Sequence, residues 1–183
     1  HDWPFVLAAL RDEMHARPWL PPRRHWPDRG EVTAGLDQLA GGSWMGLNDS
    51  GVVACILNRT GQLGPAPDKR SRGELVLEAL DHADAIDSAM AMAELDPSSY
   101  RPFNMIVADN RDAYWLRHAG PQGPGHLGHV EIIDIPEGVS MLTAQELNDP
   151  TTPRIAAYGP RFSAAPAPDP DKADWTEWIA LMT

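Results

Sequence analysis

Three consecutive charged residues, Arg11, Asp12 and Glu13, form the most suggestive chemical cluster of the sequence. They follow directly on the apolar run from Phe5 to Leu10, so they cannot all point into water. In an extended backbone, alternation places Arg11 and Glu13 on one face and Asp12 on the other. An arginine held by a carboxylate can bind an anion or stabilise a thiolate, and paired carboxylates can position a nucleophile. The alternative is a structural ion pair that ends a strand.

Two further segments carry useful groups at the ends of expected strands. Glycines surround the start of a strand in segment 41–46, and glycine lets a ligand or another backbone come close, here at Gly42 beside Trp44. Asn58 ends the next expected strand, where its amide would either donate to an oxyanion or form a turn. Cys55 lies mid-strand among apolar residues, which predicts a buried and inert thiol.

Other candidate sites have weaker signals. His126 and His129 have the spacing of metal ligands, but no cysteine or third histidine accompanies them, so we expect no metal site. Lys69, Arg70 and Arg72 would either meet an anion or lie in a solvated loop. No Walker loop, dinucleotide fingerprint, HExxH motif or GxSxG motif occurs.

The charge of the chain restricts its partners. The net charge is −11 over 183 residues, and such an acidic surface repels phosphate backbones, so we expect no nucleic-acid binding. Residues 1–72 hold nine Lys and Arg against eight Asp and Glu, a net of +1, whereas residues 73–183 hold six against eighteen, a net of −12. A site for an anionic small molecule should therefore draw on the first part.

Composition and length indicate one globular domain. The chain is 43% hydrophobic and 22% charged, which excludes disorder as a whole, and its length fits one substantial core. The single cysteine allows no internal disulfide and fits a reducing compartment, and no apolar run approaches the roughly 20 residues that a membrane span needs. We expect a cytoplasmic single domain over 1–183 that lacks the native N-terminal and C-terminal segments.

The elements that position these groups follow from apolar patterning and turn residues. Strands are expected at 5–10, 31–36, 43–47, 52–58, 103–108, 113–118, 130–135 and 139–143. Helical spacing runs from 74 to 95 with a break near Asp81, and further helices are expected at 153–162 and 175–183. The Pro-rich segment 17–30 predicts an extended loop. Because hairpins dominate over βαβ units, we expect an α+β protein with antiparallel sheets and helices outside them.

Several segments resemble the NRDE family, also called the transport-and-Golgi-organisation family. The signature-like segment is Leu7–Met14 followed by Arg17-Pro18-Trp19. Further matches follow in the same order at 41–47, 51–59, 71–74, 103–109 and 142–150, so the likeness covers nearly the whole chain. Two features differ: Leu10 stands where the family's signature begins with Asn, and the Met-Cys start of the family is absent.

The resemblance implies an N-terminal-nucleophile hydrolase-like fold, an αββα sandwich of two antiparallel sheets with helices outside. Family members typically begin Met-Cys, and this Cys looks like the nucleophile of cysteine-type amidases, with its own α-amine as the base. The full-length protein would then hydrolyse amides or thioesters. Arg11 and Asp12 would steady the thiolate, Asn58 would serve the oxyanion, and Glu13 would hold Arg11. The present chain lacks that Cys and is expected to be inactive.

The same resemblance supports a carrier, because the family is also associated with haem trafficking and with lipid or coenzyme A metabolism. A carrier would bind haem or an acyl thioester without turnover, with no other cofactor. Arginines of the first part would meet propionates or phosphates, and Trp19, Trp26 and Trp44 would supply apolar contact. His15 or His25 would ligate iron. A third alternative is a scaffold without a small-molecule site.

One cleft is expected to collect the candidate residues, because their segments end strands next to loops and match the family's signatures. The catalytic candidates are Arg11, Asp12 and Asn58, and the ligand-binding candidates are Glu13, Arg17, Gly42 and Trp44. The sequence leaves the oligomeric state open.

Overall fold

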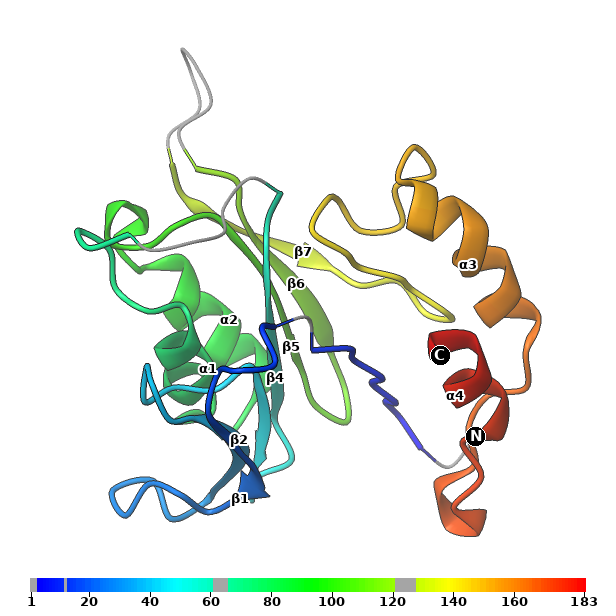
Figure 1. The fold of residues 1–183 in the computed structure, drawn as a ribbon, viewed down its shortest axis with the longest axis horizontal. Coiled ribbons are helices and arrows are strands. Elements are labelled where there is room, and N and C mark those ends of the chain that lie inside the picture. The colour runs from blue at the N-terminus through cyan, green and yellow to red at the C-terminus, as the bar shows by residue number, and fades with distance from the viewer. Residues whose placement is uncertain (1–2, 12, 61–65, 121–127) are drawn as a thin grey trace.

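One antiparallel sheet of seven strands forms the centre of the computed structural model, which describes residues 3–11, 13–60, 66–120 and 128–183 (Figure 1). Each strand pairs with its neighbours in the sequence, so the order across the sheet runs from β1 to β7. The strands are β1 (Trp19–Arg23), β2 (Val32–Asp37), β3 (Met45–Asn48), β4 (Val53–Asn58), β5 (Phe103–Ala108), β6 (Ala113–His118) and β7 (Val130–Asp134). The predicted α+β class with antiparallel pairing is confirmed.

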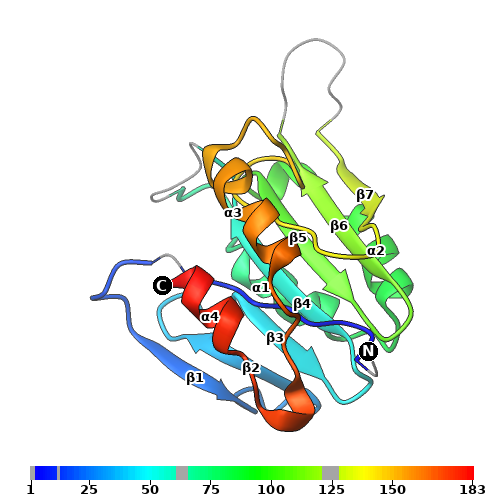
Figure 2. The ribbon, with the colours of Figure 1, turned by 90° about the vertical axis from the view of Figure 1, so that its right-hand side faces the viewer.

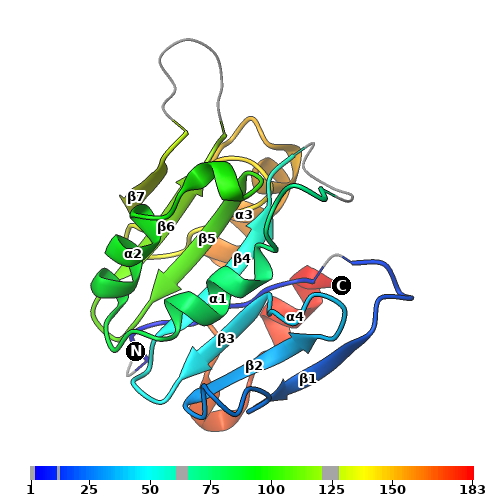
Figure 3. The same cartoon turned by 90° about the vertical axis from the view of Figure 1, so that its left-hand side faces the viewer.

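Helices lie on both sides of the sheet. Figures 1 and 3 show α1 (Gly73–Ala79) and α2 (Ala85–Ala93) packed on one face, and Figure 2 shows α3 (Pro153–Ala164) and α4 (Thr176–Met182) on the other side. Short 3-10 turns lie at η1 (Pro97–Ser99) and η2 (Pro170–Lys172). No helix in the described ranges is long and apolar enough to cross a membrane.

The predicted break near Asp81 is confirmed, and a buried amide explains where it falls. The Nδ2 atom of Asn48 donates to the carbonyl oxygens of Leu80 and His82, at 2.8 and 2.7 Å. Its Oδ1 accepts from the N–H of Val52 at 3.0 Å. The side chain at the end of β3 therefore binds carbonyls of the break between α1 and α2, where no helical partner is available to them.

The hydrophobic core fills the space between the sheet and α1 and α2, on what we call the helix face. Core residues on the strands alternate in sequence and stand in register across strands; they include Ala34, Ala54, Phe103, Met105, Val107, Leu116 and Val130. The strand residues between these core residues point to the opposite face of the sheet, which we call the far face. They include Cys55, Asn104, Trp115 and Arg117.

Two predicted strands are wrong. Segment 5–10 runs across the far face instead of along a sheet edge, so no strand lies beside it to accept its hydrogen bonds (Figure 2). Segment 139–143 is irregular as well, because the chain turns onto the far face after β7, where the Asn104 side chain binds the carbonyl oxygen of Thr143 at 2.9 Å. The described residues therefore form one sheet and not the two stacked sheets that we expected.

The Pro-rich segment predicted as a loop contains the edge strand β1, and that prediction is also corrected. All five of its residues are exposed, and it pairs only with β2, with an irregular register between Leu20 and Arg23. Pro21 and Pro22 fit there because an edge strand needs hydrogen bonds on one side only. These prolines also discourage further pairing at this edge.

Candidate functional site

Arg11 lies against two tryptophan rings. Its guanidinium carbon is 4.5 Å from the ring centroid of Trp44 and 5.9 Å from that of Trp19. The two indoles meet edge to face, with centroids 5.9 Å apart. Within the described ranges no carboxylate pairs with Arg11, so the π faces are the main partners of its charge. We call Arg11, Trp19 and Trp44 the cation–indole cluster.

Gly35 on β2 makes room for the indole of Trp44. A Cβ atom on Gly35 would lie 2.4 Å from the Cζ2 atom of Trp44, so only glycine allows this stacking on the far face. The carbonyl of Trp44 accepts from the N–H of Ile56 at 2.9 Å, which fixes its backbone beside β4. Local sequence patterning does not reveal this role of Gly35, because the contact is made with a residue outside its own strand.

Arg17 has carboxylate partners. Its Nε and Nη2 atoms donate to Oδ2 of Asp37 at 2.9 and 2.6 Å, and Glu13 lies 3.5 Å from its Nε. Glu13, which we expected to hold Arg11, therefore lies beside Arg17 instead. The charge of Arg17 is already balanced, so Arg17 serves to attach the N-terminal segment to β2.

Asp37 organises the loop that follows β2. Its Oδ1 accepts from the N–H groups of Leu39 and Ala40 at 3.0 and 3.2 Å. Burial acts to raise its pKa, but the hydrogen bonds from Arg17 and from these two amides outweigh it, so the pKa of Asp37 lies below its ordinary value. The carboxylate is thus ionised in the folded protein at neutral pH.

Gly42 lies against the start of α1. A Cβ atom on Gly42 would come within 2.4 Å of the carbonyl carbon of Gly73, and the N–H of Ser43 donates to the Gly73 carbonyl at 2.9 Å. Backbone therefore fills the space that a ligand would need beside Gly42, and the glycine permits a close approach of two chain segments.

Asn58 does not join the cation–indole cluster. It ends β4, is exposed, and pairs in register with Phe103, whose side chain is buried on the helix face. Alternation along β4 therefore directs Asn58 to the helix face, away from Arg11. Asp12, the third catalytic candidate, lies outside the described residues.

The remaining tryptophan candidate and the histidine pair have other surroundings than the cation–indole cluster. Trp26 packs against the core and donates to the carbonyl of Gly41 at 3.0 Å, so its indole is engaged within the fold. His126 lies outside the described residues, and His129 is 3.8 Å from Glu131. In the part of the chain that the structure describes, no group of three or more metal-ligating side chains occurs.

Cys55 is buried, as predicted. It is 4% exposed, and burial raises the pKa of its thiol to about 12. At neutral pH the nucleophilic thiolate is therefore almost absent, and substrates cannot reach the sulfur.

A polar cluster on the far face surrounds Asn104, which is fully buried. Its Oδ1 accepts from Nη1 of Arg59 at 2.7 Å and from Nε1 of Trp115 at 3.2 Å. Its Nδ2 donates to the carbonyls of Thr143 and Gln145 at 2.9 and 2.7 Å. The sequence carries one signal for this cluster: an Asn inside the buried apolar run of β5 needs polar partners.

Two arginines and two glutamates extend this cluster. Arg59 and Arg117 both donate to Glu146, and Arg117 also donates to Glu131 at 2.9 and 2.7 Å. Burial acts to raise the pKa of Glu146, but the two guanidinium groups outweigh it and hold that pKa below its ordinary value. The sequence-based candidates did not include any of these four residues.

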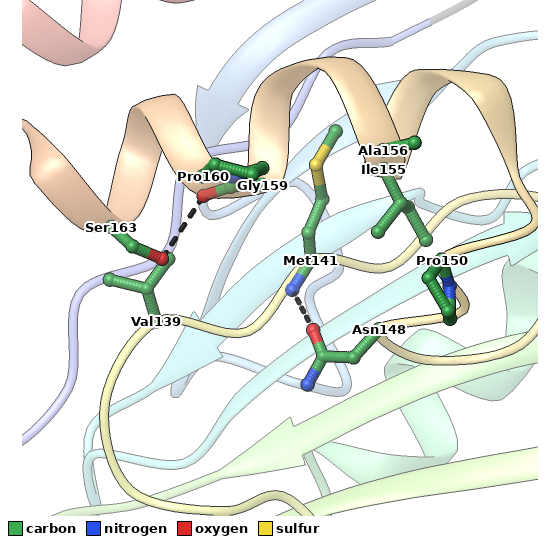
Figure 4. A pocket seen from close by; sticks show the side chains of 9 residues that line it. All are labelled: Val139, Met141, Asn148, Pro150, Ile155, Ala156, Gly159, Pro160 and Ser163. Atoms are coloured by element: carbon green, nitrogen blue, oxygen red, sulfur yellow. Dashed lines mark hydrogen bonds between the residues drawn. The ribbon is translucent and has the colours of Figure 1, made fainter.

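A separate pocket of about 430 Å³ lies between α3 and the irregular segment 139–150 (Figure 4). Its lining is mainly apolar: Val139, Met141, Asn148, Pro150, Ile155, Ala156, Gly159, Pro160 and Ser163. The Asn148 Oδ1 accepts from the N–H of Met141 at 2.7 Å, so its polar group is engaged in closing the loop. None of the predicted site residues lines this pocket.

Comparisons with known proteins agree with the sequence resemblance. A family model described as Transport and Golgi organisation 2 matches residues 1–167. The Transport and Golgi organization 2 homolog of Mus musculus is 35% identical over 107 residues, which are 57% of this chain and 38% of that protein. The Bos taurus protein named Transport and Golgi organization protein 2 homolog is 34% identical over 109 residues, again 57% of this chain and 38% of the relative. The aligned part thus spans less than half the length of these relatives.

Proposed function

Because the chain belongs to the Transport and Golgi organisation 2 family, we propose that it forms part of a cytoplasmic protein that binds an anionic small molecule with a flat or apolar portion, such as haem or an acyl-coenzyme A thioester. The observation that carries this proposal is the cation–indole cluster. A guanidinium without a carboxylate partner in the described ranges lies 4.5 Å from the Trp44 ring centroid, and Trp19 beside it is 49% exposed.

The chemistry of the cluster suits such a ligand. The guanidinium of Arg11 can donate to a propionate, carboxylate or phosphate, and the exposed indole of Trp19 can pack against a ring or an acyl chain. Arg17 contributes little direct attraction, because Asp37 already balances its charge. Binding would therefore depend on Arg11 much more than on Arg17.

Titration of the chain with hemin and with an acyl-coenzyme A, followed by tryptophan fluorescence, tests this proposal. Arg11→Ala should weaken binding about tenfold or more, and Arg11→Lys should recover part of the loss through its charge. Arg154→Ala removes the same charge from an exposed position on α3 and should change the affinity less than about twofold. Equal affinities for the Arg11 and Arg154 variants would contradict the proposal.

The hydrolase activity and the two-sheet N-terminal-nucleophile fold are a second proposal, for a longer chain that begins with Cys. Support comes from the antiparallel sheet with α1 and α2 packed on one of its faces, which is the arrangement of one half of such a sandwich (Figure 3). A chain restored to a Cys start should hydrolyse amides or thioesters, with loss of turnover when that first Cys is changed to Ala. Restored turnover that survives this change would exclude the cysteine mechanism.

A further inference from the structure

The proposed function leaves one charged cluster unused, which we call the arginine cradle: the guanidinium groups of Arg59 and Arg117 around the carboxylate of Glu146. Arg59 directly follows β4 and Arg117 lies on β6, so the sheet holds both cations. Nη2 of Arg59 donates to one oxygen of Glu146, and Nη1 of Arg117 donates to the other at 2.7 Å. Each carboxylate oxygen thus has its own guanidinium.

Each of the two arginines has a partner besides Glu146. Asn104 is fully buried and accepts from Nη1 of Arg59 at 2.7 Å, and the Arg59 side chain is only 11% exposed. Glu131 holds Nη2 of Arg117 with both of its oxygens. An anion site with donors fixed in advance binds more strongly, because little side-chain freedom is lost on binding.

The cradle retains charge and a donor for an external ligand. Without Glu146, two guanidinium groups would face the single carboxylate of Glu131, which leaves one positive charge uncompensated. Nη2 of Arg59 and Nη1 of Arg117 would then also lack the acceptor that Glu146 now provides. A charge-assisted pair between a guanidinium and a carboxylate or phosphate is among the stronger hydrogen-bonded contacts.

Glu146 itself is delivered by a segment that can be displaced. Residues 139–150 contain no helix or strand, and the Glu146 side chain is 37% exposed, so solvent reaches it. Besides the two Asn104 bonds, this segment is attached through Thr60. The N–H and the hydroxyl of Thr60 donate to the carbonyl of Ala144 at 3.1 and 3.3 Å, and Nε2 of Gln145 donates to that hydroxyl at 2.9 Å. The amide of Thr60 therefore reports whether the segment is in place.

We propose that Glu146 stands in for a ligand oxyanion: a carboxylate or phosphate group of a small molecule binds between Arg59 and Arg117, displaces Glu146, and releases segment 139–150 from the far face. The site is separate from the cation–indole cluster and does not depend on the function proposed there. Ligand binding would then uncover part of the far face.

Calorimetric titration with inorganic phosphate and with acetate tests the site, with chloride at equal ionic strength in the reference. Glu146→Gln removes the internal anion, and Glu137→Gln is the matched control because Glu137 is an exposed carboxylate close by on the same connection. The Glu146 variant should bind phosphate or acetate about tenfold or more tightly than the control. The stronger of the two anions identifies the ligand class. Equal binding by both variants would refute the site.

A second change assigns the binding to the cradle. Adding Arg59→Gln to Glu146→Gln should abolish the gain in affinity, and binding that survives this addition would place the anion elsewhere and overturn the proposal. Amide hydrogen exchange of the unaltered chain tests the displacement itself, whether or not the variants fold. Saturating phosphate or acetate should accelerate exchange of the Thr60 amide. The same acceleration by chloride alone, or none with the oxyanions, would contradict it.

Discussion

Arg11 and Arg17 carry the same charge only six positions apart, yet the structure gives them different chemistry. Arg17 is held by Asp37, with a shortest distance of 2.6 Å, and Glu13 lies near it. Arg11 rests on Trp44, and no carboxylate of the described residues pairs with it, so its guanidinium can meet a ligand. A paired arginine contributes mainly to stability, whereas one that is stacked on an indole can meet an anion at lower desolvation cost.

Changing Asp37→Asn should destabilise the fold by about 1–3 kcal/mol at pH 7, because a charge-assisted bond to Arg17 becomes neutral. The folded pKa of Asp37 is lowered, so its carboxylate stabilises the fold fully above the unfolded pKa of about 4. This contribution is lost as the pH falls through the folded pKa. Urea unfolding at pH 7 and pH 3 should therefore give a smaller difference between variant and parent at pH 3. A difference independent of pH would contradict this assignment.

Cys55 should not react in the folded chain, because the thiol is buried and its pKa is raised to about 12. A colorimetric disulfide reagent should label it only after unfolding in urea.

The chain as it stands should turn over neither amides nor thioesters. Turnover that persists in Cys55→Ala would show that some group other than this thiol performs the chemistry.

At the scale of elements, the contact between the loop after β2 and the start of α1 positions the residues that lead into β3. A Cβ atom on Gly42 would lie 2.4 Å from the carbonyl carbon of Gly73, whereas one on Gly73 would lie 3.0 Å from the carbonyl oxygen of Ser43, a milder crowding. The N–H of Ser43 donates to Gly73, and Trp44 follows directly. The cation–indole cluster on the far face thus depends on a helix that packs on the helix face.

Gly42→Ala should destabilise the chain by about 2–3 kcal/mol, because the new methyl group would meet Gly73 backbone that cannot rotate away. Gly30→Ala is the matched control, since a Cβ atom there meets nothing within 4 Å. Its effect should stay within about 0.5 kcal/mol. Chemical unfolding measures both, and equal effects would show that the close approach is unimportant.

At the scale of the whole molecule, the two faces of the sheet are covered in different ways. Helices α1 and α2 seal the helix face with a continuous apolar core. Irregular segments and α3 and α4 lie over the far face, and α3 buries only Ile155 while α4 buries none of its residues fully (Figure 2). Stability therefore concentrates on the helix face, and ligand-accessible groups lie on the far face.

Ending the chain at Ala164 should consequently lower the melting temperature by no more than about 4 °C, which corresponds to roughly 1 kcal/mol for a domain of this size. The lost contacts include Phe162 against Trp178, with centroids 5.4 Å apart, and the Trp3 bond to Asp171, and Pro168 is the one buried residue of the removed segment. Phe103→Ala in the core should cost far more, about 3–5 kcal/mol. Thermal scans compare the two, and a larger loss on shortening would show that α4 is part of the core.

The sequence alone determined most of the local structure. Apolar runs on either side of the turn at 109–112 located β5 and β6 at the residues where they occur. Helical spacing with its break gave α1 and α2, because such spacing records which side of a helix faces the core. It also identified Cys55 as a buried thiol and placed Arg11 and Trp44 among the candidates.

Tertiary structure decided what these elements pair with. Segment 5–10 has the composition of a strand but lies across a face where no partner backbone accepts its bonds, and the Pro-rich segment became β1 because an edge needs bonds on one side. Asn58 and Arg11 fell on opposite faces, since strand register and not proximity in the sequence sets the face. Glu146 contacts Arg59 although 87 positions separate them in the sequence. This contact forms only when the chain folds back over the far face, and no local pattern encodes it.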